Sequence, residues 1–202
     1  AGASTGGFTD VLLARGAREV VAADVGYGQL IWRLQNDERV QVLDRTNVRS
    51  LAAETIKGTV DLVVADLSFI SLRLVLPALA ACVHDGADLL PMIKPQFEVG
   101  RDRVGHGGVV RDPALRTEAV LEVVRDAERH GLSTKGAVAS PLPGPSGNVE
   151  YFLWLRREGE VAGDVGRPGV ITSSSADTEG GDEMGTTDVE VMVRRAVAEG
   201  PQ

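Results

Sequence analysis

The chain opens on a glycine-rich stretch, A-G-A-S-T-G-G over residues 1–7, which leads into an apolar segment that predicts a helix over residues 7–15. Its glycines can take positive φ and let the backbone approach a ligand closely. Its serine and threonine offer hydroxyls and are favoured helix caps. Free N–H groups at a helix N-terminus bind polar and anionic ligands. We therefore predict a cradle for a nucleotide-like cofactor, formed by Gly2, Ala3, Ser4, Thr5, Gly6 and Gly7.

The glycine spacing differs from two better-known loops. G-x-G-x-x-G is absent, which disfavours a nicotinamide dehydrogenase, and no G-K-[ST] is present, which excludes a P-loop. A tight strand-to-helix turn that binds no ligand is the alternative interpretation. A turn of this kind normally follows a buried strand, and none precedes Ala1, so we expect the chain to be a fragment of a longer protein.

Polar side chains also follow the next two apolar runs. Asp24 ends the run 19–24, about twenty residues after the glycines, where a carboxylate accepts ribose hydroxyls in nucleotide-binding α/β units. The run 40–43 leads to Asn47, in a polar segment where a purine edge could be read. Either side chain could instead cap a helix. The ordered series of polar strand ends favours a cofactor site.

Three charged residues of mixed sign lie at the ends of later strands. Asp66 follows a predicted strand over 60–65 and Lys94 follows one over 87–93. Both should point into the crevice at the carboxyl ends of a parallel sheet. Glu150 begins a late strand that we expect to be antiparallel, which places it at the same edge. Each residue also has an ordinary interpretation: Asp66 could cap a helix, Lys94 could extend to solvent, and Glu150 could be a solvated carboxylate. Their convergence favours a site beside the cofactor.

Strands alternate with helices along the chain, which predicts an α/β fold with a mostly parallel sheet and helices on both faces. Pro77 should interrupt or bend the helix expected over 72–82, and Pro113 should lie at the first turn of the helix expected over 113–130. A short, stiff segment joins the last two strands, which predicts an antiparallel C-terminal hairpin. The expected helices span 29–35, 72–82 and 113–130, and the hairpin strands span 133–140 and 149–155.

Composition limits the possible classes of protein. The 202 residues suit one α/β domain with an appendage, and the 43% hydrophobic content can form an aliphatic core. The single cysteine, Cys82, excludes an internal disulfide and indicates a reducing, cytoplasmic compartment. No apolar run is long enough to span a bilayer, so we expect no stable membrane insertion. The three histidines lack metal-ligand spacing, and we expect no metal site.

The C-terminal part differs in composition from the rest. Residues 158–190 hold nine Asp or Glu against one Arg, and they account for much of the net charge of −8. We expect a domain over 1–157, a flexible acidic linker over 158–187, and a short helix and tail over 188–202. Asp188 should cap that helix, whose apolar side should dock back on the domain. An acidic domain is by itself a poor binder of nucleic acid.

Five motifs point to a known family: G-A-S-T-G-G-F-T-D at 2–10, A-D-V-G-Y-G-Q-L at 23–30, A-D-L-S-F-I-S at 65–71, K-P-Q-F-E-V-G at 94–100 and S-P-L-P-G-P-S-G-N-V-E-Y-F at 140–152. With them the chain resembles the hemolysin-type (TlyA family) ribosomal RNA 2′-O-methyltransferases, a branch of the FtsJ-like methyltransferases. The resemblance covers residues 1 to about 157. It implies a Rossmann-like fold, S-adenosylmethionine as cofactor, and ribosomal RNA or ribosomal subunits as partner.

The resemblance also implies roles for individual residues. Asp66, Lys94 and Glu150 match the last three members of the Lys-Asp-Lys-Glu tetrad of the wider group, and Lys94 in its neutral form would take the proton of the ribose hydroxyl. Asn47 falls where the adenine edge is usually met. The cofactor positions implied are the glycine-rich stretch, Asp24, Asn47 and Asp66.

The chain departs from the family pattern upstream. The first tetrad lysine of the family lies in an S-R-G-x-x-K-L-like segment, which follows a basic S4-type RNA-binding domain, and neither is present. A non-catalytic remnant that binds RNA or a partner is therefore the alternative to an enzyme. A cytolytic protein is a third hypothesis, which the acidic balance and the lack of a basic amphipathic helix disfavour.

Overall fold

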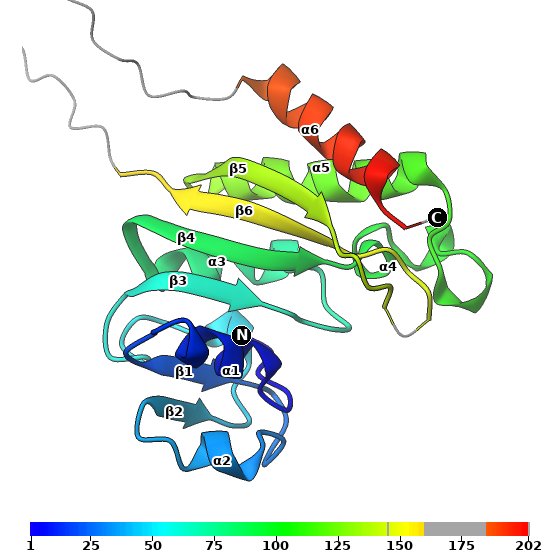
Figure 1. Ribbon diagram of the computed structural model, residues 1–202. Helices are drawn as coiled ribbons and strands as arrows, with labels where there is room; N and C mark the ends of the chain where they lie inside the picture. The colour runs from blue at the N-terminus through cyan, green and yellow to red at the C-terminus, as the bar shows by residue number, and fades with distance from the viewer. Residues whose placement is uncertain (145, 160–184, 202) are drawn as a thin grey trace, which may run out of the picture.

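The structure is a computed structural model that describes residues 1–144, 146–159 and 185–201 (Figure 1). Its strands are β1 (Val20–Ala23), β2 (Val40–Leu43), β3 (Val60–Ala65), β4 (Val83–Ile93), β5 (Leu132–Ala139) and β6 (Tyr151–Arg157). Its α-helices are α1 (Gly7–Ala14), α2 (Trp32–Gln35), α3 (Leu76–Ala81), α4 (Pro95–Glu98), α5 (Pro113–Arg129) and α6 (Thr186–Glu199). Short 3₁₀ turns are η1 (Val48–Ser50), η2 (Leu72–Leu74), η3 (Arg101–Arg103) and η4 (His106–Gly108).

The strands form two sheets, one of order β1-β2 and one of order β3-β4-β6-β5. The pairs β1–β2 and β3–β4 are parallel. Strand β6 is antiparallel to both β4 and β5, which confirms the predicted C-terminal hairpin. The carboxyl ends of β3 and β4 therefore lie at the same edge as the start of β6. This arrangement brings Asp66, Lys94 and Glu150 to the same edge of the four-stranded sheet.

The first residues of the chain connect the two sheets. Ala1 donates its terminal N–H to the Val64 carbonyl at 2.8 Å, and the Ala1 carbonyl accepts from Asp66 N at 3.0 Å. On the other side, the N–H groups of Gly2 and Ala3 both donate to the Ala23 carbonyl. The glycine-rich stretch is thus held between the end of β1 and the end of β3 (Figure 1).

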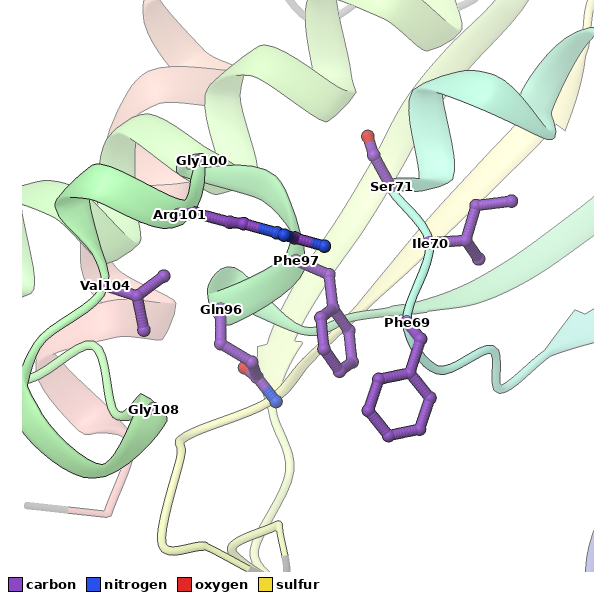
Figure 2. A pocket seen from close by; sticks show the side chains of 9 residues that line it. All are labelled: Phe69, Ile70, Ser71, Gln96, Phe97, Gly100, Arg101, Val104 and Gly108. Carbon is purple, nitrogen blue, oxygen red and sulfur yellow. The ribbon is translucent and has the colours of Figure 1, made fainter.

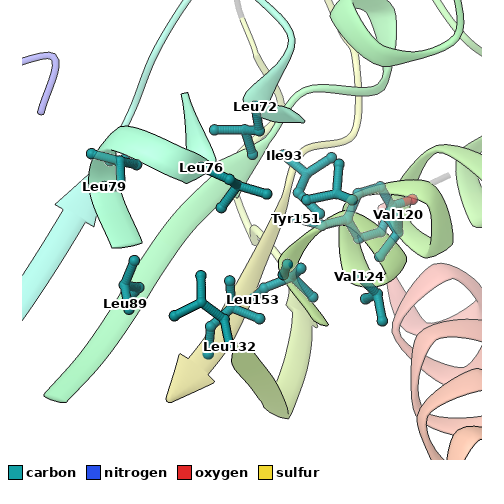
Figure 3. Close-up of a cluster of buried hydrophobic side chains, with 14 of the residues drawn as sticks. Leu72, Leu76, Leu79, Leu89, Ile93, Val120, Val124, Leu132, Tyr151 and Leu153 are labelled. Carbon is teal, nitrogen blue, oxygen red and sulfur yellow. The ribbon is translucent and has the colours of Figure 1, made fainter. Parts of the chain in front are cut away.

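The core is aliphatic, as the composition predicts. It lies between the four-stranded sheet and the helices α3, α5 and α6, and includes the buried residues Leu76, Leu89, Val120, Tyr151 and Leu153 (Figure 3). Cys82 is 1% exposed and behaves as a small buried hydrophobe, and burial raises the pKa of its thiol. The strands that deliver the catalytic candidates are therefore anchored in a packed interior.

The helix expected over 72–82 is interrupted near Pro77, as predicted: the 3₁₀ turn η2 is followed by α3, and Pro77 lies in the first turn of α3, where its missing N–H costs nothing. Other expected boundaries were wrong. Strand β4 begins at Val83 instead of residue 87. Helix α2 begins at Trp32 instead of residue 29, since the backbone of Ile31 is extended, with a ψ of 147°, and Ile31 is the N-cap.

Helix α6 packs against the domain through Val189, Val193, Ala196 and Val197, which are buried. Its N-cap is Gly185, not the expected Asp188, which lies within the first turn. Most of the linker expected over 158–187 falls outside the described residues, so the division into domain, linker and tail stays a prediction. Of the helices in the described part of the chain, none is long and apolar enough to cross a membrane.

Candidate active site

The glycine-rich stretch forms a tight loop that leads into α1. The N-cap of α1 is Gly6, with a φ of 108° and no side-chain hydrogen bond, so the expected capping by Ser4 or Thr5 was wrong. A hydroxyl cap needs an extended backbone, whereas this position takes a left-handed one that favours glycine. Position 2 accepts only glycine, because a Cβ on Gly2 would lie 2.0 Å from the Asp66 carbonyl oxygen.

A cavity of about 450 Å³ opens over this loop. No heavy atom lies within 4 Å of the position that a Cβ on Gly7 would take, so the first turn of α1 faces open space. The exposed ring of Phe8 stands at the same cavity and meets Phe152 edge to face at 6.2 Å. The cavity is lined by Gly2, Ala3, Ser4, Thr5, Gly7, Phe8, Val11 and Asp66.

Asp24 ties the loop to the end of β1. Its carboxylate accepts from Ser4 N and from Gly26 N, each at 2.8 Å. A carboxylate has about four lone-pair sites, so further acceptor capacity remains for a ligand hydroxyl. Asn47, by contrast, caps η1 by accepting from Arg49 N at 3.0 Å, which is the helix-cap role considered as its alternative.

Asp66 and Lys94 meet at the carboxyl ends of β3 and β4, as the strand geometry predicts. Lys94 Nζ lies 2.6 Å from Asp66 Oδ1 and donates a hydrogen bond to Ser68 Oγ at 3.0 Å. The Lys94 side chain is only 11% exposed. The amine is therefore held by two partners, and its third N–H direction is left for another ligand. Sequence reasoning missed Ser68, although it lies inside the A-D-L-S-F-I-S motif.

Glu150 precedes β6 and is 7% exposed. Burial raises its pKa above the ordinary value, the nearby Lys94 ammonium opposes that rise, and the Asp66 carboxylate adds to it. Tyr151 pairs with Ile93 across β6 and β4, so Glu150 lies at the edge of the sheet where Lys94 pairs with Asp66. Gly144 lies against Glu150 so closely that a Cβ there would be 2.6 Å from Oε1.

Two buried polar residues position the segments that carry this cluster. Asn148, 2% exposed, accepts from Val110 N at 2.9 Å and donates to the Gly108 carbonyl at 2.8 Å. Glu98, 4% exposed, accepts from Ser71 Oγ at 2.5 Å and Leu72 N at 2.8 Å. Both partners are distant in sequence, so no local pattern reveals either role.

Glu98 gives a prediction for stability against pH. Burial raises the pKa of its carboxyl, although its hydrogen-bond donors and Arg73 oppose the rise. The folded state therefore binds more protons than the unfolded state between the two pKa values, and this contribution to stability is lost as pH rises through the folded pKa. For Glu98→Gln, which cannot titrate, we expect the unfolding free energy relative to wild type to increase from about pH 4 to pH 7.

Urea unfolding at several pH values measures this difference. Glu118→Gln is the matched control, because the ion pair with Arg103 lowers the pKa of Glu118. The difference in unfolding free energy between Glu118→Gln and wild type should stay nearly constant above about pH 5 and rise as pH falls below it. If the unfolding free energy of Glu98→Gln relative to wild type stays constant or falls between pH 4 and pH 7, the raised pKa of Glu98 is contradicted.

Comparisons with known proteins agree with this geometry. Residues 1–157 match the FtsJ-like methyltransferase family. The chain is 57% identical over 201 residues to the 16S/23S rRNA (cytidine-2′-O)-methyltransferase TlyA of Mycobacterium tuberculosis. The alignment covers 100% of this chain and 67% of that protein. A hemolysin-named structure from Streptococcus thermophilus has a TM-score of 0.80 and 36% identity, covering 98% of this chain and 65% of that one.

More distant structures share the fold alone. The N-methyltransferase NodS from Bradyrhizobium japonicum WM9, in complex with S-adenosyl-L-homocysteine, has a TM-score of 0.54 at 15% identity and covers 77% of this chain and 74% of that one. The expected Rossmann-like methyltransferase fold is thereby confirmed. With the family match over most of its length, the chain is a methyltransferase that belongs to the FtsJ-like family.

Proposed function

We propose that the protein transfers a methyl group from S-adenosylmethionine to a ribose 2′-hydroxyl of ribosomal RNA. The observation that carries this proposal is the amine of Lys94, whose side chain is 11% exposed and which Asp66 and Ser68 hold at the edge of the sheet where Glu150 also lies. Asp66 also lines the cavity over the glycine-rich loop, so the amine lies next to the proposed cofactor site. The M. tuberculosis relative carries this activity in its name.

The residues over the loop fit such a cofactor. The lack of a side chain at Gly2 lets the loop pack against the Asp66 carbonyl, and the lack of one at Gly7 leaves the first turn of α1 accessible to a ligand. The Asp24 carboxylate can still accept a hydrogen bond from a ligand hydroxyl. The loop from Gly2 to Gly7, Asp24 and Asp66 would hold the cofactor, and Asn47 would do so only after giving up its helix cap. S-adenosylmethionine, when bound, supplies an electrophilic methyl group on a sulfonium sulfur.

The polar cluster prepares the hydroxyl for methylation. Lys94 in its neutral form accepts the hydroxyl proton at Nζ, and the Asp66 carboxylate stabilises the ammonium that results. Ser68 restrains the direction of the amine, and Glu150 orients the hydroxyl from the other side by a hydrogen bond. Fixing the nucleophile in this way supplies much of the catalysis in a displacement reaction.

The charge distribution is compatible with an RNA substrate. Outside residues 158–190, the chain contains twenty acidic and twenty basic residues, so this part has no net charge and the acidic excess of the chain lies in 158–190. A neutral surface does not repel phosphates as a strongly acidic one does. Basic residues supplied elsewhere in the protein or by the ribosome would contribute the remaining affinity.

Methyl transfer is tested with the protein expressed from its complete gene and S-adenosylmethionine labelled in the methyl group. Substrates are separated ribosomal subunits and naked ribosomal RNA from cells that lack the enzyme. We expect label in the RNA of at least one preparation and none after heat inactivation. Cofactor binding without labelled RNA would instead support the non-catalytic remnant. Leakage of dye from liposomes at micromolar protein would support the cytolytic hypothesis.

A further inference from the structure

Helix α6 lies outside the part of the chain that matches the methyltransferase family, which ends at residue 157. It packs beside β5 and α5 (Figure 1). Its buried residues Val189, Val193 and Val197 belong to the same hydrophobic core as Tyr151 and Leu153 of β6. The helix is therefore an addition to the methyltransferase domain that is built into the core of that domain.

The C-terminal end of α6 reaches the hairpin that carries Glu150. Gly200, the C-cap of the helix, is buried. A Cβ on Gly200 would lie 2.9 Å from the Ala139 Cβ and 3.3 Å from Val149 Cγ1. Ala139 is the last residue of β5, and Val149 directly precedes Glu150. One buried glycine thus lies against both arms of the hairpin, next to the catalytic carboxylate.

Glycine is needed at position 200 for space and not for its backbone freedom. Gly200 has a φ of −68° and a ψ of 165°, an extended conformation that any residue adopts. Two Cβ atoms 2.9 Å apart would overlap, so a side chain here must push the end of α6 away from β5. The lack of a side chain therefore serves the close contact between helix and hairpin.

This contact adjoins the hydrogen bond that closes the hairpin beside Glu150. Ser140 donates its backbone N–H to the Glu150 carbonyl at 2.8 Å. Ala139, the residue before Ser140, pairs with Tyr151, the residue after Glu150. The backbone of Glu150 is thus held by the same turn of chain that Gly200 supports, and a shift of Ala139 would move the carboxylate.

The same arm of the hairpin also contacts a cavity of about 410 Å³ formed by the segments that follow β3 and β4 (Figure 2). Asn148 donates to the carbonyl of Gly108, which lines this cavity. The exposed ring of Phe69 stands at the cavity and meets the ring of Phe97 at 5.3 Å. A displacement of residues 148–150 would therefore disturb this cavity as well as the Glu150 carboxylate.

We propose that α6 braces the active site: its C-terminal end, seated against Ala139 and Val149, holds the hairpin where the Glu150 carboxylate faces the substrate hydroxyl. This inference rests on the proposed function. The helix acts through the hairpin and is a positioning element. Loosening it should slow methyl transfer and spare cofactor binding, because the glycine-rich loop is held between β1 and β3.

Gly200→Ala tests the brace in the protein expressed from its complete gene. We expect single-turnover methyl transfer at saturating RNA to fall roughly 10- to 100-fold, with the dissociation constant for S-adenosylmethionine within about twofold of wild type. Ala139→Gly removes the Cβ that alanine at position 200 would meet, so the double variant should recover most of the lost rate. Recovery of this kind is specific to the contact, because a general loss of stability would add to the cost of the second substitution.

Gly185→Ala is the matched control at the other end of α6. Gly185 has nearly the same backbone conformation as Gly200, with a φ of −64° and a ψ of 155°. A Cβ there would lie 3.6 Å from Asp188 Oδ2, an ordinary contact distance. The rate of methyl transfer by Gly185→Ala should equal that of wild type.

Hydrogen exchange measures the brace without catalysis. In Gly200→Ala the Ser140 amide should exchange at least about tenfold faster than in wild type, since its bond to Glu150 opens more often. The Glu158 amide donates to the Gly131 carbonyl at the far end of the hairpin and should exchange at the wild-type rate.

The outcomes separate the brace from the proposed function. If Gly200→Ala speeds Ser140 exchange but wild type transfers no methyl group, the proposed function fails and the support of the hairpin by α6 stands. If Ser140 exchange is unchanged, the brace is overturned. It is also overturned if wild type is active and Gly200→Ala equals it, or if Ala139→Gly restores none of the lost rate.

Discussion

Replacing Lys94 by alanine is expected to lower kcat for RNA methylation by roughly 10²- to 10⁴-fold, the range typical of losing a general base. The dissociation constant for S-adenosylmethionine should change by less than about twofold, because Lys94 is absent from the lining of the loop cavity. Single-turnover kinetics with saturating RNA, together with calorimetric titration of the cofactor, measure the two quantities separately.

Lys94→Arg distinguishes a base from a fixed positive charge. A guanidinium can replace the ion pair with Asp66 but cannot give up a proton at any usable pH, so it should remain as inactive as alanine. Ser68→Ala is the milder control, since it removes one hydrogen bond and leaves the amine in place. Substantial activity in Lys94→Arg would show that the residue acts by charge alone and would contradict its role as the base.

Placing a methyl group on Gly2 is expected to have the second-largest effect. In Gly2→Ala the new Cβ would lie 2.0 Å from the Asp66 carbonyl oxygen, so the loop and the end of β3 must separate. We expect a loss of about 1–3 kcal/mol of stability from this crowding and at least a tenfold weaker affinity for S-adenosylmethionine, since the displaced loop also holds Asp66. Thermal unfolding and cofactor titration measure the two effects.

Gly16→Ala is the control that isolates the crowding. Gly16 also takes a positive φ, of 92°, but no heavy atom lies within 4 Å of its Cβ position. Alanine there should bring only the backbone strain, about 1–2 kcal/mol, and leave cofactor affinity unchanged. Wild-type cofactor affinity in Gly2→Ala would argue against the glycine-rich loop as the cofactor site.

The meeting of Asp66 and Lys94 could be predicted because it depends on simple geometry. Each follows an apolar run of strand length, and the ends of parallel strands share an edge of the sheet. The hairpin that brings Glu150 to that edge was predictable from the short joint before β6. These elements are anchored by apolar residues, whose pattern along the chain is a strong signal.

The supporting residues could not be predicted in the same way. Glu98 and Asn148 act through partners 26 to 40 residues away, and a buried polar residue looks in sequence like a surface one. Phe69 was equally hidden, since a phenylalanine in an apolar motif predicts burial, whereas the backbone around it holds the ring in solvent. Asn47 and Asp24 had the same competing interpretation, and in the structure both accept hydrogen bonds from nearby backbone N–H groups.

The position of the transferred methyl group tests the account most directly. RNA methylated with a trideuterated methyl donor would be digested to nucleosides and analysed by mass spectrometry, and the intact RNA would be probed by alkaline hydrolysis. We predict a labelled 2′-O-methylnucleoside and a single alkali-resistant linkage at its position, with neither in the Lys94→Ala sample. Label on a base, with every linkage still cleaved by alkali, would contradict the assignment of Lys94, Asp66 and Glu150 to a ribose hydroxyl.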